Sequence, residues 1–146
     1  MRISDEGLNL IKQWESFSDK AYPDPATGSS PWTIGYGHTR GVRPGMTCTQ
    51  EQAEDWLLED VADASKAVQD YIRVPLTQGQ FDALVSFVYN VGVHNFNTST
   101  MLKKINNQDL DGAAKEFPRW NQGGGHVLLG LARRREAERK LFTGEV

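Results

Sequence analysis

The residues between Thr49 and Pro75 constrain the fold of this chain most strongly. Thr49 and Gln52 form a capping-box pattern, and apolar residues then recur at helical spacing as far as Tyr71. The pattern predicts a helix over about 50–72 that ends before the proline. At 1.5 Å per residue such a helix is roughly 35 Å long. It either connects two lobes or spans a single core, and its length alone does not separate these alternatives.

Helical patterns also dominate the second half of the chain. Thr77 and Gln80 repeat the capping box, and the helix that follows is expected to stop at Gly92. Ser4 is a candidate cap for a first helix that fades near Glu15. The other predicted helices cover 98–106, 108–117 and about 130–142, and 122–126 is expected to be a loop because it holds three consecutive glycines.

Residues 17–40 predict loops and β structure, because prolines at three positions exclude a helix. In the segment 32–37 large side chains alternate with Thr33, Gly35 and Gly37. One face of this strand is therefore expected to pack inward, and the sparse face around Thr33 leaves room for a ligand. The glycines equally suit turns or bulges, and the two roles are compatible.

Size and charge narrow the class of protein. A chain of 146 residues predicts one compact unit, and the formal net charge of −3 argues against an electrostatic nucleic-acid binder. Cys48 is the only cysteine, which excludes an internal disulfide and favours folding in a reducing compartment. A small buried apolar role suits Cys48 better than a nucleophilic one.

Three further patterns argue against other functions. The N-terminus lacks the apolar run of a secretory signal, and no apolar stretch approaches ~18 residues, so membrane insertion is not expected. His38, His94 and His126 lack metal-ligand spacing, so we expect no metal and no cofactor. The basic segment 133–135 is interpreted as a solvated helix face paired with nearby glutamates, in preference to a nucleic-acid contact.

Two carboxylates and a hydroxyl remain as candidates for chemistry. Glu15 stands at the end of a helix between Trp14 and Phe17, where the helix dipole and apolar neighbours favour a protonated carboxyl, as a general acid requires. Asp24 lies between two prolines that restrict its orientation, and Thr33 offers a hydroxyl. Each has a plain alternative as an exposed glutamate, a turn aspartate or a strand threonine. Together they match the needs of glycosidic bond cleavage.

Several motifs in order resemble one family. The run WTIGYGHT at 32–39 follows the acid-loop-acid segment, and FVYNVG occupies 87–92. Further matches occur at 45–47, 74–76, 80–84, 99–102, 130–131 and 133–138. The chain resembles phage-type lysozymes, glycoside hydrolase family 24, over nearly its whole length.

The resemblance implies an α+β, lysozyme-like fold. A small β-containing lobe over about 14–48 and a larger helical lobe, made of about 73–146 together with the first helix, would flank a cleft. The helix at 50–72 would then connect the lobes. The whole chain, 1–146, would form a single lysozyme-like domain.

The resemblance also implies a muramidase that cleaves the β-1,4 bond between N-acetylmuramic acid and N-acetylglucosamine in peptidoglycan. Glu15 would protonate the leaving oxygen, and Asp24 and Thr33 would act with the attacking water, with inversion at the anomeric carbon. The residues expected to contact the substrate are Tyr36, His38, Asn90 and Arg133. A lytic transglycosylase and a non-catalytic wall-binding relative are the alternatives.

A phage or prophage endolysin is therefore expected, monomeric, made in the host cytoplasm and acting on the wall in the periplasm. A holin would give it access to the wall. The chain departs from the family pattern at Ser16, where glycine is usual, and in a longer interval between Asp24 and Thr33.

Overall fold

Helices make up most of the molecule, and a short antiparallel hairpin interrupts them near the N-terminus. The computed structural model describes residues 1–25, 27–123 and 126–145. The helices are α1 (Asp5–Glu15), α2 (Gln50–Tyr71), α3 (Gln78–Val91), α4 (Val93–Asn97), α5 (Thr100–Asn106), α6 (Leu110–Ala114) and α7 (Leu129–Thr143), with a 3-10 turn, η1 (Phe117–Arg119). The strands are β1 (Ser18–Tyr22), β2 (Thr33–Gly35), β3 (Gln122–Gly123) and β4 (His126–Val127).

Local capping determines where the two longest helices begin. The Thr49 hydroxyl accepts a hydrogen bond from the Gln52 backbone N–H at 3.1 Å, and the Gln52 side chain accepts from the Thr49 N–H at 2.9 Å. Thr77 and Gln80 make the same reciprocal pair at the start of α3. These bonds satisfy backbone donors that a helix start leaves without partners. The predicted long helix and the predicted helix after Thr77 are both confirmed.

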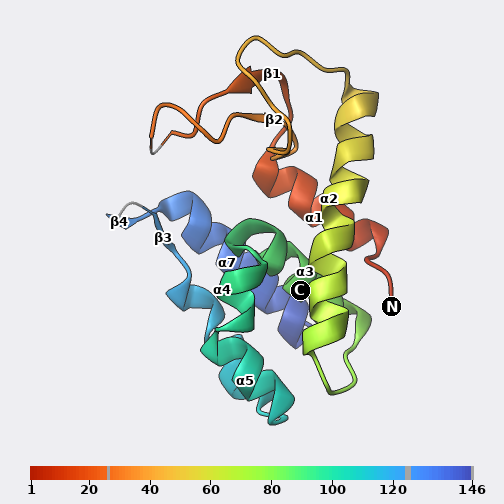
Figure 1. The fold of residues 1–146 in the computed structure, drawn as a ribbon. Helices are drawn as coiled ribbons and strands as arrows, with labels where there is room; N and C mark the ends of the chain where they lie inside the picture. Colours follow the sequence, from red (N-terminus) through yellow and green to blue (C-terminus); the bar gives the residue numbers. More distant parts are fainter. Residues whose placement is uncertain (26, 124–125, 146) are drawn as a thin grey trace.

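Figure 1 shows how these elements are arranged. The β1–β2 hairpin and the loop that follows it lie at one end, the shorter helices lie at the other, and α2 runs alongside both. We call residues 16–48 the β lobe, and α1 together with α3–α7 the helical lobe. The prediction of an α+β fold is confirmed.

The core lies around α3, most of whose residues are buried. This helix packs against α1, α2 and α7. Phe87 illustrates the packing, because its ring makes edge contacts with Phe117 and Trp120, both at a centroid distance of 5.5 Å. One end of α2 instead packs against the β lobe, where a Cβ on Gly35 would come 3.0 Å from the Cβ of Ala53. That close approach explains the glycine in β2.

The β1–β2 hairpin is irregular. Ser18 pairs with Gly35 and Tyr22 pairs with Thr33, with a register shift between them. The loop 23–32 therefore leaves and re-enters the hairpin beside Tyr22 and Thr33. Asp24 lies at the start of this loop.

Two of the predicted helices, at 98–106 and 108–117, differ from the structure at their ends. The region 98–106 holds α5 only from Thr100, and α4 precedes it. The region 108–117 is divided into α6 and η1. The Asp109 side chain accepts from the Gly112 N–H at 3.0 Å and so caps the start of α6, and the 3-10 turn that follows contains Pro118. These breaks depend on side-chain caps that helical periodicity does not register.

The loop expected at 122–126 is also partly wrong. Gln122 pairs with Val127 and Gly123 pairs with His126, which forms the β3–β4 ladder, and positions 124–125 lie outside the described residues. The last helix agrees with its prediction to within a residue at each end. Within the described part of the chain, none of the helices has the length and apolar character needed to cross a bilayer.

Candidate active site

Glu15 is the last residue of α1, and its carboxylate faces the helical lobe. Its Oε2 accepts a hydrogen bond from Arg134 Nη1 on α7 at 2.5 Å. The Arg134 side chain is only 4% exposed, whereas that of Glu15 is 17% exposed. A charge-assisted bond to a buried arginine limits the rotamers of the carboxylate while part of it stays accessible. The sequence predicted apolar neighbours for Glu15 and did not predict this arginine.

Arg134 is itself held by a buried polar network between α3 and α7. Its Nε lies 3.3 Å from Glu138 Oε2, and its Nη2 donates to the Ser86 carbonyl at 3.1 Å. The Ser86 hydroxyl donates to the same glutamate oxygen at 2.6 Å. Arg135 Nε lies 2.9 Å from the other oxygen, Oε1. The network therefore carries two arginines and two glutamates, counting Glu15, in which opposite charges balance.

Burial dominates the electrostatics of this network. It raises the pKa of Glu138, against the opposing influence of the two arginines. It also lowers the pKa of Arg135 to about 10. Both shifts show that the charged forms are desolvated, so their mutual pairing is what makes them tolerable in the core.

The interpretation of the basic segment as a solvated helix face is therefore wrong for two of its three residues. Arg134 and Arg135 are buried, and only Arg133 is exposed. A signal was present in the sequence. The apolar residues Leu131 and Phe142 lie on the same face of α7 as Arg134, Arg135 and Glu138, at helical spacing. A helix with so few apolar residues on its inner face must bury its charged residues in pairs.

Gly37 forms a wall of the site. A Cβ on this residue would lie 2.5 Å from Glu15 Oε1, and its φ of +80° is a value that favours glycine. The carboxyl group of Glu15 is therefore held between Arg134 on one side and the Gly37 backbone on the other. The expectation of a bare strand face open to ligand is wrong for Gly35 and Gly37, because the first packs on α2 and the second on Glu15.

The hairpin brings the other two candidates to the same region. Burial raises the pKa of Tyr22, and the charge of Glu15 adds to that rise, so Tyr22 lies within electrostatic reach of Glu15. Thr33 is the cross-strand partner of Tyr22. Asp24 follows two residues later, where its carbonyl accepts from the Gly28 N–H at 2.7 Å and its N–H donates to Ser29 at 2.9 Å. Both candidates thus lie at the loop end of the hairpin, whereas Gly37, which follows the other end of β2, lies against Glu15.

Tyr36 and His38 lie beneath the site surface. Tyr36 is 6% exposed, and its hydroxyl accepts from Gln50 Nε2 at 2.9 Å. His38 is 7% exposed, its Nδ1 lies 2.7 Å from Asp60 Oδ2, and its ring stacks on Trp56 at 4.6 Å. These contacts attach the β lobe to α2. Tyr36 and His38, which were expected to contact substrate, therefore have a structural role.

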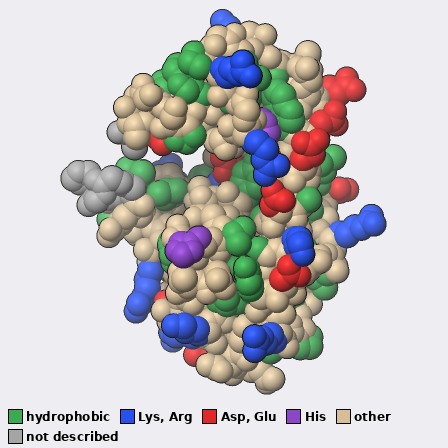
Figure 2. Space-filling model, viewed as in Figure 1, with side chains coloured by type: hydrophobic (Ala, Val, Ile, Leu, Met, Phe, Trp, Pro, Cys, Tyr) green, Lys and Arg blue, Asp and Glu red, His purple; other side chains and the backbone are tan. Residues whose placement is uncertain are grey.

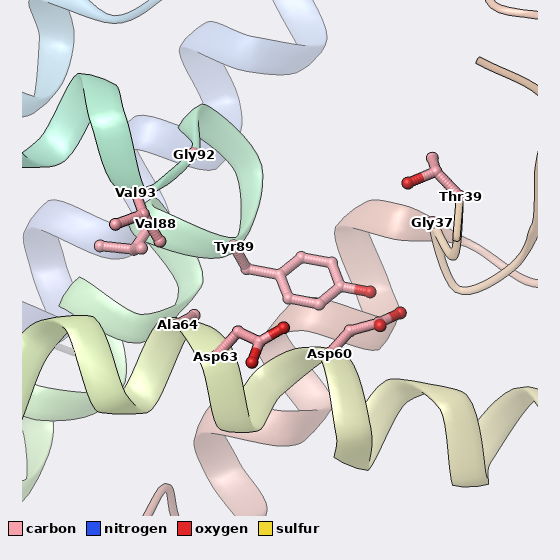
Figure 3. Close-up of a pocket in the computed structure, with 9 residues that line it drawn as sticks. All are labelled: Gly37, Thr39, Asp60, Asp63, Ala64, Val88, Tyr89, Gly92 and Val93. Atoms are coloured by element: carbon pink, nitrogen blue, oxygen red, sulfur yellow. The ribbon is translucent and has the colours of Figure 1, made fainter. Parts of the chain in front are cut away.

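A cavity of about 220 Å³ opens where the β lobe, α2 and α3 meet. Figure 3 shows Tyr89 reaching from α3 toward the segment that carries Gly37 and Thr39, with Asp60 and Asp63 of α2 beside it. Tyr89 donates its hydroxyl hydrogen to the Tyr36 carbonyl at 2.6 Å. Sequence reasoning did not select Tyr89, because a tyrosine in an apolar helical pattern is normally read as core.

A second cavity, of about 400 Å³, lies on the other side of the C-terminal end of α3. Asn90, Trp120 and Leu131 help to line it. The side chain of Asn90 accepts from Arg135 Nη2 at 2.8 Å, which ties this cavity to the buried network. Figure 2 shows the surface hollowed between the β lobe and the helical lobe.

This geometry agrees with what comparison to known proteins finds. A family model described as phage lysozyme matches residues 12–138. The chain belongs to the phage lysozyme family. It is similar to an endolysin of Acyrthosiphon pisum secondary endosymbiont phage 1, with 47% identity over 97% of this chain and 98% of that relative. It is also similar to the solved muramidase domain of SpmX from Asticaccaulis excentricus, with a TM-score of 0.88, 39% identity and 97% of each chain covered.

Some relatives of this phage lysozyme are longer. The chain is 46% identical to an endolysin of Bacillus phage B103 and spans 56% of its length.

Ser16, the residue after the candidate acid, has an unusual backbone conformation. Ser16 takes φ 56° and ψ 153°, a conformation that glycine adopts more readily than serine.

Proposed function

We propose that this phage lysozyme hydrolyses the β-1,4 bond between N-acetylmuramic acid and N-acetylglucosamine, with Glu15 as the general acid. The observation that carries the proposal is the setting of Glu15. Its carboxyl group is bound by Arg134 and lies against Gly37, yet the Glu15 side chain remains 17% exposed. A proton donor must be both held and accessible to the leaving oxygen.

The proposed reaction uses the three candidates in distinct roles. Glu15 gives its proton to the glycosidic oxygen as the bond to the anomeric carbon breaks. A water held by Asp24 and Thr33 attacks that carbon from the opposite face and gives its proton to the Asp24 carboxylate, with inversion of configuration. Inverting enzymes place their two carboxyl groups about 6.5–9.5 Å apart to admit this water. Arg134 stabilises the Glu15 carboxylate that remains after the proton has left.

The proposed substrate contacts follow the hollow between the lobes. Thr39 lines the cavity on one side of α3, and Asn90 lines the cavity on the other. Arg133 is exposed at the start of α7 and is available to an anionic part of the wall. Tyr36 and His38 support these contacts from below.

Replacing the acid tests the proposal. The substitution Glu15→Gln should lower clearing of purified peptidoglycan by about 10²- to 10⁴-fold, the usual contribution of a general acid. The matched control is Glu6→Gln, an exposed glutamate in the first turn of the same helix, which should keep wild-type activity. Full activity in Glu15→Gln, with an unchanged circular dichroism spectrum, would refute the acid assignment.

Product analysis separates the alternatives. Hydrolysis yields reducing N-acetylmuramic acid ends that take up ¹⁸O from labelled water, and proton NMR of the first products should show the α anomer. A lytic transglycosylase would yield anhydromuramic ends without ¹⁸O. A non-catalytic wall-binding protein would pellet with peptidoglycan and release nothing.

We also propose that the chain acts as a monomeric endolysin that needs a holin to leave the host cytoplasm. Expression in the cytoplasm of a Gram-negative host should then cause little lysis until a holin is co-expressed. Rapid lysis without any pore-forming partner would contradict this route. Size-exclusion chromatography with light scattering should give a mass near 16.3 kDa.

A further inference from the structure

Tyr89 makes a hydrogen bond between the two lobes. It lies on α3 in the helical lobe, and its hydroxyl donates to the carbonyl of Tyr36 in the β lobe at 2.6 Å. The Tyr36 side chain is separately anchored to Gln50. The bond from Tyr89 therefore acts on the backbone of the β lobe and not on a mobile side chain.

The carbonyl that Tyr89 binds belongs to the peptide joining Tyr36 to Gly37. Glu15 Oε1 lies on the side of Gly37 where a side chain would project, since a Cβ there would be 2.5 Å from that oxygen. The other carboxyl oxygen, Oε2, is bound by Arg134. One oxygen of Glu15 is thus located by an arginine, and the other by a peptide that Tyr89 holds in place.

We propose that Tyr89 is a positioning residue for the reaction, whose hydroxyl fixes the Tyr36–Gly37 peptide and thereby sets where the Glu15 carboxyl delivers its proton. This inference rests on the proposed function and deepens it. Displacement of a reacting group by about 1 Å can lower a rate roughly 100-fold. A bond of this kind can therefore matter to turnover without touching the substrate.

The hydroxyl acts only as a donor. Burial raises the pKa of Tyr89 well above its usual range, and the negative charges of Glu15 and Asp60 add to the rise. The raised pKa favours the protonated hydroxyl, which is the form that donates to the Tyr36 carbonyl. The Tyr89 ring lines the cavity in Figure 3, so the ring and the hydroxyl have separable roles.

The substitution Tyr89→Phe separates these roles, because it removes the hydroxyl and keeps the ring. We expect kcat on soluble glycan strands to fall about 10- to 100-fold, while KM changes by less than about twofold, since the cavity wall is retained. Hydrogen exchange of the backbone amides at 36–40 should become faster in the variant. The control is Tyr71→Phe at the end of α2, which removes a hydroxyl from the core margin away from Glu15 and should alter neither kcat nor exchange at 36–40.

The outcomes distinguish this inference from the proposed function. An inactive wild type, or a fully active Glu15→Gln, would overturn the proposed function and this inference with it. An active wild type whose kcat survives Tyr89→Phe would overturn this inference alone. A rise in KM at constant kcat would also overturn it, because that result would make Tyr89 a substrate contact and not a positioning residue.

Discussion

Glu138 offers the sharpest test of the buried network, because its charge can be removed without changing its shape. It is fully buried, and it contacts Arg134, Arg135 and the hydroxyl of Ser86. The substitution Glu138→Gln leaves two buried guanidinium groups with Glu15 as the one remaining carboxylate among the described members of the network. One positive charge is then uncompensated in the core.

The expected loss of stability follows from that unpaired charge. Removing one partner of a buried ion pair costs about 3–5 kcal/mol. Native proteins are stable by only about 5–15 kcal/mol, so the variant should remain folded but marginal. For a chain of this size, each kcal/mol lowers Tm by roughly 2–4 °C, which gives a decrease of roughly 6–20 °C.

Urea unfolding followed by circular dichroism measures this loss directly. The matched control is Glu136→Gln on the same helix, whose carboxylate pairs with Arg139 at the surface and should shift Tm by no more than about 2 °C. Equal unfolding midpoints for Glu138→Gln and the wild type would refute the claim that this network is electrostatically balanced. Equal losses in the two variants would refute the importance of burial.

A double variant tests the mechanism and not only the position. Glu138→Gln combined with Arg135→Met removes the negative charge together with one of the positive charges. If the uncompensated charge causes the instability, the double variant should be more stable than the sum of the two single losses predicts. Strict additivity would show that the side chains contribute separately and that charge balance is not the cause.

Three smaller predictions concern the surroundings of the site. Gly37→Ala should abolish most clearing of peptidoglycan, because its Cβ would displace Glu15. The control Gly41→Ala has a similar φ of +72° and open space around it, so it should lose stability but keep activity. Equal activities of the two variants would contradict the assignment of Gly37 as a wall of the active site. Ser16→Gly should relieve the strained backbone and stabilise the protein by about 1–3 kcal/mol in urea unfolding, and an unchanged midpoint would contradict this. Burial raises the pKa of Cys48, so its thiol should alkylate more slowly than free cysteine at pH 8, and Cys48→Ser should clear peptidoglycan at the wild-type rate; loss of clearing would reopen a catalytic role.

Local signals in the chain were sufficient for the elements that frame the molecule. The capping boxes at Thr49 and Thr77 predicted the starts of α2 and α3 because a cap involves residues only three apart. The prolines and glycines of 17–40 predicted the absence of a helix there for the same reason. The short elements between 98 and 127 were less predictable. Their ends depend on contacts such as the Asp109 cap and the β3–β4 pairing, which compete with weak helical periodicity.

The site around Glu15 shows the same difference between what local sequence patterns predict and what depends on packing. Motif order along the chain selected Glu15, Asp24 and Thr33, and the hairpin register explains how the last two approach the same region. Arg134 could not be assigned to Glu15 from sequence, since 118 positions separate them along the chain and only the packing of α1 against the α3–α7 pair brings them into contact.

By itself, therefore, the sequence determined the long helix α2, the non-helical segment after α1, the family and the choice of the three candidate groups. All of these depend on residues near one another or on their order. The tertiary structure alone decided what surrounds Glu15. Arg134 and Gly37 come from different elements and meet at the Glu15 carboxyl group only after the lobes pack together, and Tyr89 then binds the peptide that precedes Gly37. Electrostatic and steric effects act through space at a few ångströms, so their pairing depends on the fold and not on spacing along the chain.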